Sequence, residues 1–221
     1  MDVLKFKYSL IFLIIPIILC FGSCKPSAVN SKQMEAYIEK SGNGLIKSNN
    51  EKQVKVSVNF RPSDLLVEQE LKAFPYTTLK TIDSLRNIYQ KNLYFVLHMS
   101  YKEQEVLTGL VGESNKFSEM VEKLSFEMNN YISLTTDIGD TLQLLDFVYP
   151  RMYGMSGGTD IMFVFENKIH SGIEELHFNL NECGLNIGKM QFPFKVRDIY
   201  SIPRLTFSTN TINTNIKKNK R

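Results

Sequence analysis

The apolar residues of this chain change their spacing along the sequence, and this change limits the fold more than any other feature. Within residues 115–128 the apolar residues recur every three or four positions, which predicts one stripe of an amphipathic helix. From residue 131 onward apolar and polar residues alternate instead, which predicts half-buried strands. The helical stripe consists of Phe117, Met120, Val121, Leu124 and Met128.

The first half of the chain contains three further predicted helices and two strands. A weak helix is expected at 32–40 with Ser31 as its N-cap, a second at 65–72, and a third that Thr78 caps, after a break at Phe74-Pro75. Strands are expected at 54–60, where valines alternate with polar residues, and at 93–99, where nearly every residue is apolar.

The second half reads as strands joined by turns. Residues 131–135 and 141–149 flank a turn at 137–140 and predict a hairpin, and further strands are expected at 161–165, 176–180 and 190–196. Pro193 cannot donate a backbone hydrogen bond, so its strand should lie at a sheet edge. Helices concentrated early and strands late predict an α+β fold, with helices packed on a largely antiparallel sheet in a single domain.

The composition excludes one class of partner. With 26 Lys and Arg against 23 Asp and Glu, the 221-residue chain has a formal charge of +3. A nucleic-acid-binding protein needs a concentrated basic face, so we expect no nucleic-acid partner.

The N-terminal segment has the pattern of a secretory signal. Lys5 and Lys7 precede an apolar run over residues 10–21, after which Gly22 and Ser23 are small. A membrane-spanning helix needs about 20 apolar residues, and this run is shorter and contains Pro16. We therefore expect a cleaved signal peptide rather than a permanent membrane helix.

The end of this segment, Phe21-Gly22-Ser23-Cys24, resembles the lipobox of bacterial lipoproteins, with Phe21 at the position where Leu is commonest. The resemblance implies that Cys24 carries a diacylglycerol and becomes the acylated N-terminus of the mature chain. By the same analogy, Lys25 after the anchor favours the outer membrane of the cell envelope, on either its periplasmic or its outer face. As a whole the chain resembles the small envelope lipoproteins of Gram-negative bacteria.

The predicted organisation has four parts. Residues 1–23 are the signal peptide, 24–52 a lipidated N-terminus and tether with a weak helix, 53–207 an α+β globular domain, and 208–221 a disordered basic tail. The three histidines lack metal-ligand spacing, and Cys183 has no second cysteine or histidine at such a spacing beside it. We therefore expect no metal and no cofactor.

One motif suggests an enzyme. Residues 154–158 match G-x-S-x-G, with Ser156 as the nucleophile and Asp160 and then His170 or His177 as nominal partners. A nucleophile elbow needs a helix after the serine, whereas the residues after Ser156 are typical of a strand. We therefore favour a glycine-rich loop that joins two strands as the interpretation of this motif.

The same loop is the best sequence-based candidate for a binding rim, because loops on rigid sheets often carry recognition. We therefore expect a non-enzymatic binding or assembly component, held at the membrane by lipid on Cys24, with an envelope protein as a candidate partner. The alternatives are a periplasmic or surface hydrolase that uses Ser156, and a carrier with an apolar pocket. The rim residues are Arg151, Tyr153, Thr159 and Asp160; the carrier pocket would be lined by Phe163, Phe165, Phe178, Phe192 and Phe194.

Overall fold

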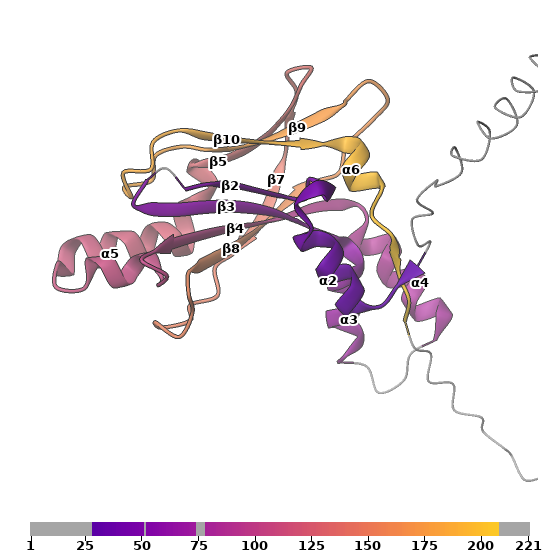
Figure 1. Cartoon of the computed structure of the whole chain (residues 1–221), viewed down its shortest axis with the longest axis horizontal. Coiled ribbons are helices and arrows are strands. Elements are labelled where there is room, and N and C mark those ends of the chain that lie inside the picture. Colours follow the sequence, from indigo (N-terminus) through magenta and orange to yellow (C-terminus); the bar gives the residue numbers. More distant parts are fainter. Residues whose placement is uncertain (1–27, 51, 74–77, 208–221) are drawn as a thin grey trace, which may run out of the picture.

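The computed structural model describes residues 28–50, 52–73 and 78–207. Within them most of the strands form two antiparallel sheets that pack face to face, and two short strands form a separate parallel pair (Figure 1). The larger sheet has the strand order β2-β3-β4-β8-β7, and the smaller has β10-β9-β5-β6. The predicted α+β fold with antiparallel strands in a single domain is confirmed, and its strands are divided between two sheets.

The elements follow one another in this order along the chain: β1 (Ala28–Val29), α2 (Ser31–Glu39), η2 (Ser41–Asn43), β2 (Ile46–Asn49), β3 (Val54–Arg61), α3 (Ser63–Leu71), α4 (Leu79–Tyr89), β4 (Asn92–Tyr101), η3 (Val106–Leu110), α5 (Ser114–Glu122), η4 (Lys123–Glu127), η5 (Met128–Asn130), β5 (Ile132–Thr136), β6 (Thr141–Leu142), β7 (Leu144–Val148), β8 (Thr159–Glu166), β9 (Glu175–Leu180), β10 (Met190–Lys195), α6 (Val196–Tyr200) and β11 (Arg204–Leu205).

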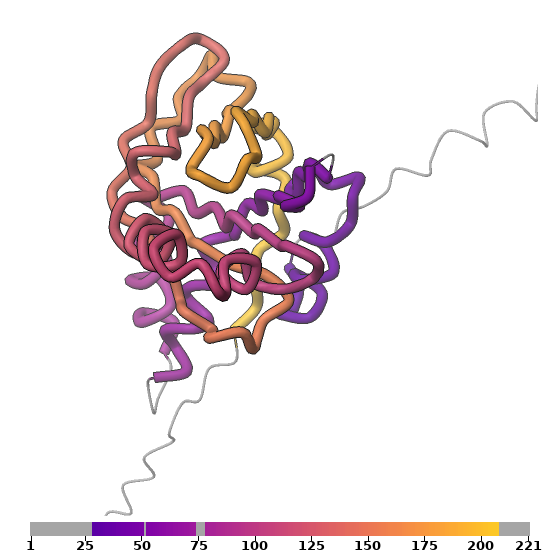
Figure 2. The backbone as a smooth tube through the Cα atoms, turned by 90° about the vertical axis from the view of Figure 1, so that its left-hand side faces the viewer, coloured from indigo at the N-terminus to yellow at the C-terminus, as the bar shows by residue number. Residues whose placement is uncertain are grey.

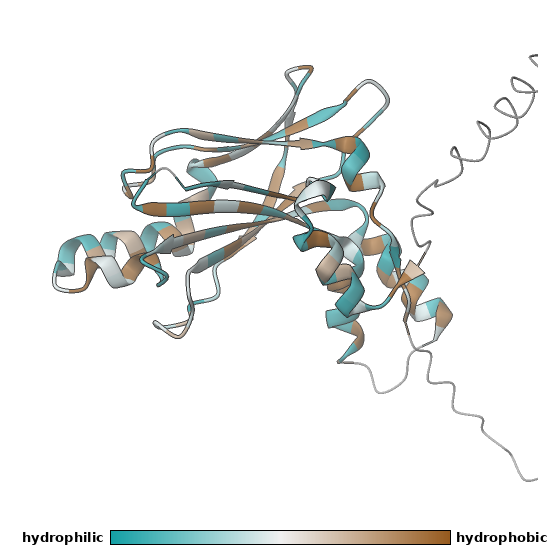
Figure 3. Cartoon of the chain, in the orientation of Figure 1, coloured by the Kyte–Doolittle hydropathy of each residue, from teal (hydrophilic) through white to brown (hydrophobic). Residues whose placement is uncertain are grey.

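The alternating sequence pattern explains the strands. In β3, Val56 and Val58 are fully buried, while Lys55, which directly precedes Val56, is exposed. One face of the strand therefore packs against the core, as the alternating hydropathy along it indicates (Figure 3). Val58 lies opposite Leu97 of β4, which is also fully buried. Pro193 lies in β10 at the edge of the smaller sheet, as predicted.

The predicted hairpin is confirmed only in its first part. Leu134 of β5 pairs with Leu142 of β6 in the smaller sheet, but Leu144 of β7 already pairs with Phe165 in the larger one. A single residue, Gln143, separates β6 from β7. The segment expected as one strand therefore passes from one sheet to the other and joins them along one side.

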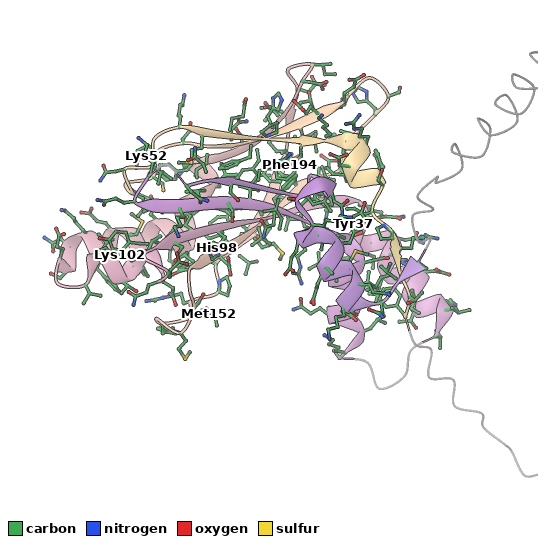
Figure 4. The ribbon with its side chains drawn as sticks, viewed as in Figure 1. Tyr37, Lys52, His98, Lys102, Met152 and Phe194 are labelled. Atoms are coloured by element: carbon green, nitrogen blue, oxygen red, sulfur yellow. The ribbon has the colours of Figure 1, made fainter. Side chains whose placement is uncertain are left out.

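Phenylalanine rings fill the space between the sheets. The Phe95 ring of β4 lies with its centroid 5.2 Å from that of Phe194 and 5.6 Å from that of Phe178, both in the other sheet. Figure 4 labels Phe194 between the two layers. The five phenylalanines proposed to line a carrier pocket are 0–3% exposed. They pack as a core, so they lend no support to an apolar-ligand cavity between the sheets.

Helices α2, α3 and α4 stand together at one end of the sheets (Figure 1). Thr78 caps α4 as predicted, since its hydroxyl accepts from the Thr81 N–H at 3.1 Å. The N-cap of α2 is Asn30 and not Ser31, because Asn30 and Gln33 exchange two hydrogen bonds in a capping box.

The expected tether is more structured than its polar sequence indicates. Met34 of α2 and Leu45 are 0–1% exposed, and β2 forms the edge of the larger sheet. The short strand β1 pairs in parallel with β11, so the two ends of the described chain lie side by side (Figures 1 and 2). The fold therefore includes residues 28–50, well before the predicted boundary at 53.

The predicted helix at 115–128 is regular only to Glu122. A π-helical turn and a 3-10 turn follow, and they keep Leu124 and Met128 fully buried while Phe126 is 76% exposed. The described ranges contain no helix with the length and apolarity to cross a bilayer. The predicted signal peptide, Cys24, the break at Phe74-Pro75 and the tail at 208–221 lie outside the described residues.

Candidate functional site

Two tight turns meet near one end of the larger sheet. The first directly follows β4, where Lys102 and Glu103 have φ values of 51° and 60°. The Tyr101 N–H donates to the Gln104 carbonyl at 2.9 Å, and the Gln104 N–H donates back at 3.1 Å. Two successive residues with positive φ are the requirement of a type I′ hairpin turn. Glu105 directly follows this turn and is buried at the edge of the core.

The second turn lies in the loop between β7 and β8, on which Figure 4 labels Met152. Tyr153 has φ 53° and Gly154 φ 82°, and the Met155 N–H donates to the Met152 carbonyl at 3.1 Å. A non-glycine residue in this conformation costs about 1–2 kcal/mol. The surrounding contacts therefore have to hold Tyr153 in place.

Glu105 provides the contact that joins the two turns. Its side chain is only 3% exposed, and one carboxylate oxygen accepts from the Gly154 N–H at 2.7 Å. Its neighbour Val106 donates its N–H to the Thr159 hydroxyl at 3.1 Å, and Thr159 is 1% exposed. These bonds fix the segment that begins at Glu105 to the loop and to the start of β8.

A cavity of about 360 Å³ lies between this segment and the loop. Its walls are mostly apolar and aromatic, and Arg151 lies at it with its guanidinium carbon 5.0 Å from the centroid of the Tyr153 ring. The lining residues are Glu105, Leu107, Thr108, Val111, Phe117, Tyr149, Arg151, Tyr153 and Gly154. We call this cavity the loop pocket.

Two polar groups of the loop pocket are incompletely satisfied. The Tyr149 hydroxyl is buried and has no hydrogen-bond partner among the described residues. Burial raises the pKa of Tyr149, the Glu105 carboxylate raises it further, and the Arg151 cation opposes the rise. None of the ion pairs in the described ranges includes Glu105. A buried carboxylate without a cation and a hydroxyl without a partner are both costly to a folded protein.

The rim of the loop pocket carries exposed apolar side chains. Val111 and Tyr153, which line the pocket, are 74% and 75% exposed, and Met152 and Met155 on the same loop as Tyr153 are 43% and 79% exposed. Large apolar side chains gathered around a concave site are typical of a recognition surface.

The structure divides the four predicted rim residues. Arg151 and Tyr153 line the loop pocket, whereas Thr159 does not. Thr159 is buried, and its hydroxyl accepts a hydrogen bond from the Val106 N–H. Asp160 points to the opposite face of β8, because successive residues of a strand alternate between faces. The predicted group is therefore not one site.

On that outer face, Asp160 pairs with His98 of β4. The two residues are directly opposite in register, and His98 Nδ1 lies 2.7 Å from an Asp160 carboxylate oxygen. The hydrogen bond to Asp160 raises the pKa of His98, while partial burial opposes the rise. A Cβ on Gly158 would lie 2.3 Å from His98 Cε1, so the imidazole takes this position only because residue 158 is glycine.

The nominal hydrolase triad is not assembled. Strand β8 follows Ser156 where a nucleophile elbow needs a helix, and the Ser156 hydroxyl donates to the Gly158 carbonyl at 2.6 Å. Asp160 pairs with His98 rather than with either predicted partner, since His177 pairs with Glu175 and His170 lies near Asp140. Order along the chain did not reveal the pair of Asp160 and His98, because it depends on β4 and β8 being neighbours in the sheet.

Nothing in the sequence pattern singled out Glu105, Tyr149 or His98. Glu105 follows a turn in a stretch without periodicity, and Tyr149 reads as the end of a strand.

Among the described residues no three His, Cys, Asp or Glu side chains gather into a metal site. Compared with known protein families, curated proteins and solved structures, the chain matches none of them. The loop pocket therefore has to be interpreted from its own chemistry.

Proposed function

We propose that this chain is a lipid-anchored lipoprotein of the bacterial envelope that acts as a non-enzymatic binding or assembly component. Its binding site in this proposal is the loop pocket. The observation that carries the proposal is the combination of an apolar cavity of about 360 Å³ with the buried Glu105 carboxylate and the unpartnered Tyr149 hydroxyl. Apolar walls with a few placed polar groups are typical of ligand-binding sites.

The anchoring half of the proposal rests on Cys24 and on the residues before it. Each buried CH₂ of an acyl chain contributes about 0.8 kcal/mol, so two or three chains hold a protein firmly at a membrane. The first described strand begins at Ala28, four residues after Cys24. Four residues of chain span at most about 14 Å even when fully extended, so the folded domain would stay close to the membrane. Lys25 after the anchor supports the outer membrane as that membrane, by analogy with bacterial lipoproteins.

Mass spectrometry of the mature N-terminus tests the anchor. We expect loss of residues 1–23 and a diacylglycerol-modified, acylated Cys24 in the membrane fraction. Cys24→Ser should abolish lipidation and leave an uncleaved precursor or a released soluble chain. An unmodified Cys24, or a mature chain that begins at another residue, would contradict the lipoprotein assignment.

Photo-crosslinking in intact cells tests the pocket. A benzoyl-phenylalanine in place of Tyr153, which is 75% exposed at the pocket rim, should form a defined adduct with an envelope component. The same probe at Leu79, which is 70% exposed at the start of α4, is the matched control and should form none.

A second variant tests whether the adduct depends on the cavity itself. Thr108→Trp places a large ring in the pocket lining from an exposed position, and it should remove the adduct. Thr141→Trp, on the exposed end of β6, should leave it unchanged. Equal adducts at positions 153 and 79, or an adduct that survives Thr108→Trp, would argue against the loop pocket as the binding site.

A further inference from the structure

We propose that the loop pocket binds a primary ammonium group carried on a small apolar body, an inference that rests on the proposed binding function. Two acceptors identify the ammonium: the Glu105 carboxylate and the Tyr149 hydroxyl oxygen. The residues around them identify the apolar body, because the lining consists largely of aliphatic and aromatic side chains.

The Glu105 carboxylate lacks a cation. Glu105 is 3% exposed, and its hydrogen bond from the Gly154 N–H is neutral. A buried carboxylate is stabilised far more by a cation that also donates hydrogen bonds than by a neutral donor. Arg151 belongs to the same pocket, yet it stacks on Tyr153 and forms no ion pair with Glu105 within the described residues. The place of the cation at Glu105 is therefore open to a ligand.

The Tyr149 hydroxyl is the second group of the pocket that can accept a hydrogen bond from a ligand. The buried Tyr149 hydroxyl has no partner among the described residues, and Tyr149 lines the same cavity as Glu105. A primary ammonium has three N–H donors, so one group can serve both acceptors. A quaternary ammonium has none, and it could use only the rings of Tyr149, Tyr153 and Phe117 through cation–π attraction.

The volume of the loop pocket limits the size of the apolar part of the ligand. Ligand pockets measure about 300–1,000 Å³, and the loop pocket at about 360 Å³ is at the small end of that range. One ring or a short branched chain next to the ammonium suits this volume, with Leu107, Val111 and Phe117 against the apolar part.

Titrations of the isotope-labelled full chain in detergent micelles, followed at the Gly154 amide that donates to Glu105, test the inference. The probes are 2-phenylethylammonium, its neutral counterpart 2-phenylethanol, and the N-trimethylated ammonium. We expect the primary ammonium to bind at least about tenfold more tightly than the alcohol, the worth of one charged hydrogen bond. The trimethylated probe should bind more weakly than the primary ammonium.

Three variants identify the groups responsible. Glu105→Gln keeps an acceptor for the Gly154 N–H but removes the charge, so it should abolish the preference for ammonium and leave alcohol binding unchanged. Tyr149→Phe keeps the ring and should weaken ammonium binding about fivefold. Glu103→Gln removes an exposed carboxylate that pairs with Lys55 outside the pocket, and it should bind every probe as the unaltered chain does.

The outcomes separate this inference from the function on which it rests. If the alcohol and the ammonium bind equally, or the trimethylated probe binds as tightly as the primary one, the ammonium inference is overturned while the pocket remains a binding site. A preference for ammonium that survives Glu105→Gln overturns it as well. If no probe perturbs Gly154, both the inference and the proposed role of the loop pocket fail.

Discussion

Replacement of Phe95 by alanine should remove much of what holds the two sheets together. Phe95 is fully buried, and its ring contacts four other phenylalanine rings at centroid distances of 5.2–6.0 Å. Phe→Ala in a core costs about 3–5 kcal/mol, and aromatic pairs add about 0.5–1.5 kcal/mol each beyond their burial. Four pairs place Phe95→Ala at the upper end of that range, about 5 kcal/mol, against a typical total stability of about 5–15 kcal/mol.

Urea unfolding of the folded domain, residues 28–207, without detergent measures this loss of unfolding free energy. With a typical slope of about 2 kcal/mol per molar urea, the midpoint should fall by about 2.5 M. Phe126→Ala is the control, because Phe126 is 76% exposed and its removal should change stability by less than about 0.5 kcal/mol. A loss below about 2 kcal/mol for Phe95→Ala, at an unchanged slope, would show that the phenylalanine cluster does not hold the sheets together.

Three further measurements test particular residues. The hydrogen bond to Asp160 raises the pKa of His98 in the folded protein. The pair therefore stabilises the fold fully below the ordinary histidine pKa of about 6.5, and this stabilisation is lost as the pH rises through the raised pKa of His98 in the folded protein. Asp160→Asn should therefore destabilise the protein more at pH 5 than at pH 9, by less than about 1 kcal/mol because both side chains are at least a third exposed; an equal effect at both pH values would contradict the pairing. Leu124→Asp should cost about 3–5 kcal/mol in urea unfolding, since Leu124 is fully buried, whereas Glu122→Ala on the exposed side should cost little. A fluorophosphonate probe should not label Ser156, whose hydroxyl donates to a backbone carbonyl; labelling that disappears in Ser156→Ala would revive the hydrolase alternative.

Periodicity alone predicted most of the elements. The alternation of Val54, Val56 and Val58 placed β3, and Pro193 placed β10 at a sheet edge. The helical stripe through Met120 and Leu124 identified the buried face of α5 and the turn after it. These predictions succeed because burial on one face imposes a period on the sequence of a single segment.

Other features of the fold depended on contacts between segments. Nothing local distinguishes the polar residues of β2 from a tether, and only their pairing with β3 makes them a strand. The passage of the chain between the sheets at Gln143 is likewise invisible in a run of apolar residues.

The candidate site shows the same division most clearly. The sequence identified the loop with Arg151 and Tyr153, because glycine and polar residues between two strands predict an exposed loop. Only the tertiary structure brought Glu105 to the Gly154 N–H, 49 positions along the chain, and left the Tyr149 hydroxyl buried in the lining of the same pocket. The physical reason is that periodicity records which side of a segment is buried, whereas a pocket depends on which segments the packed sheets place together.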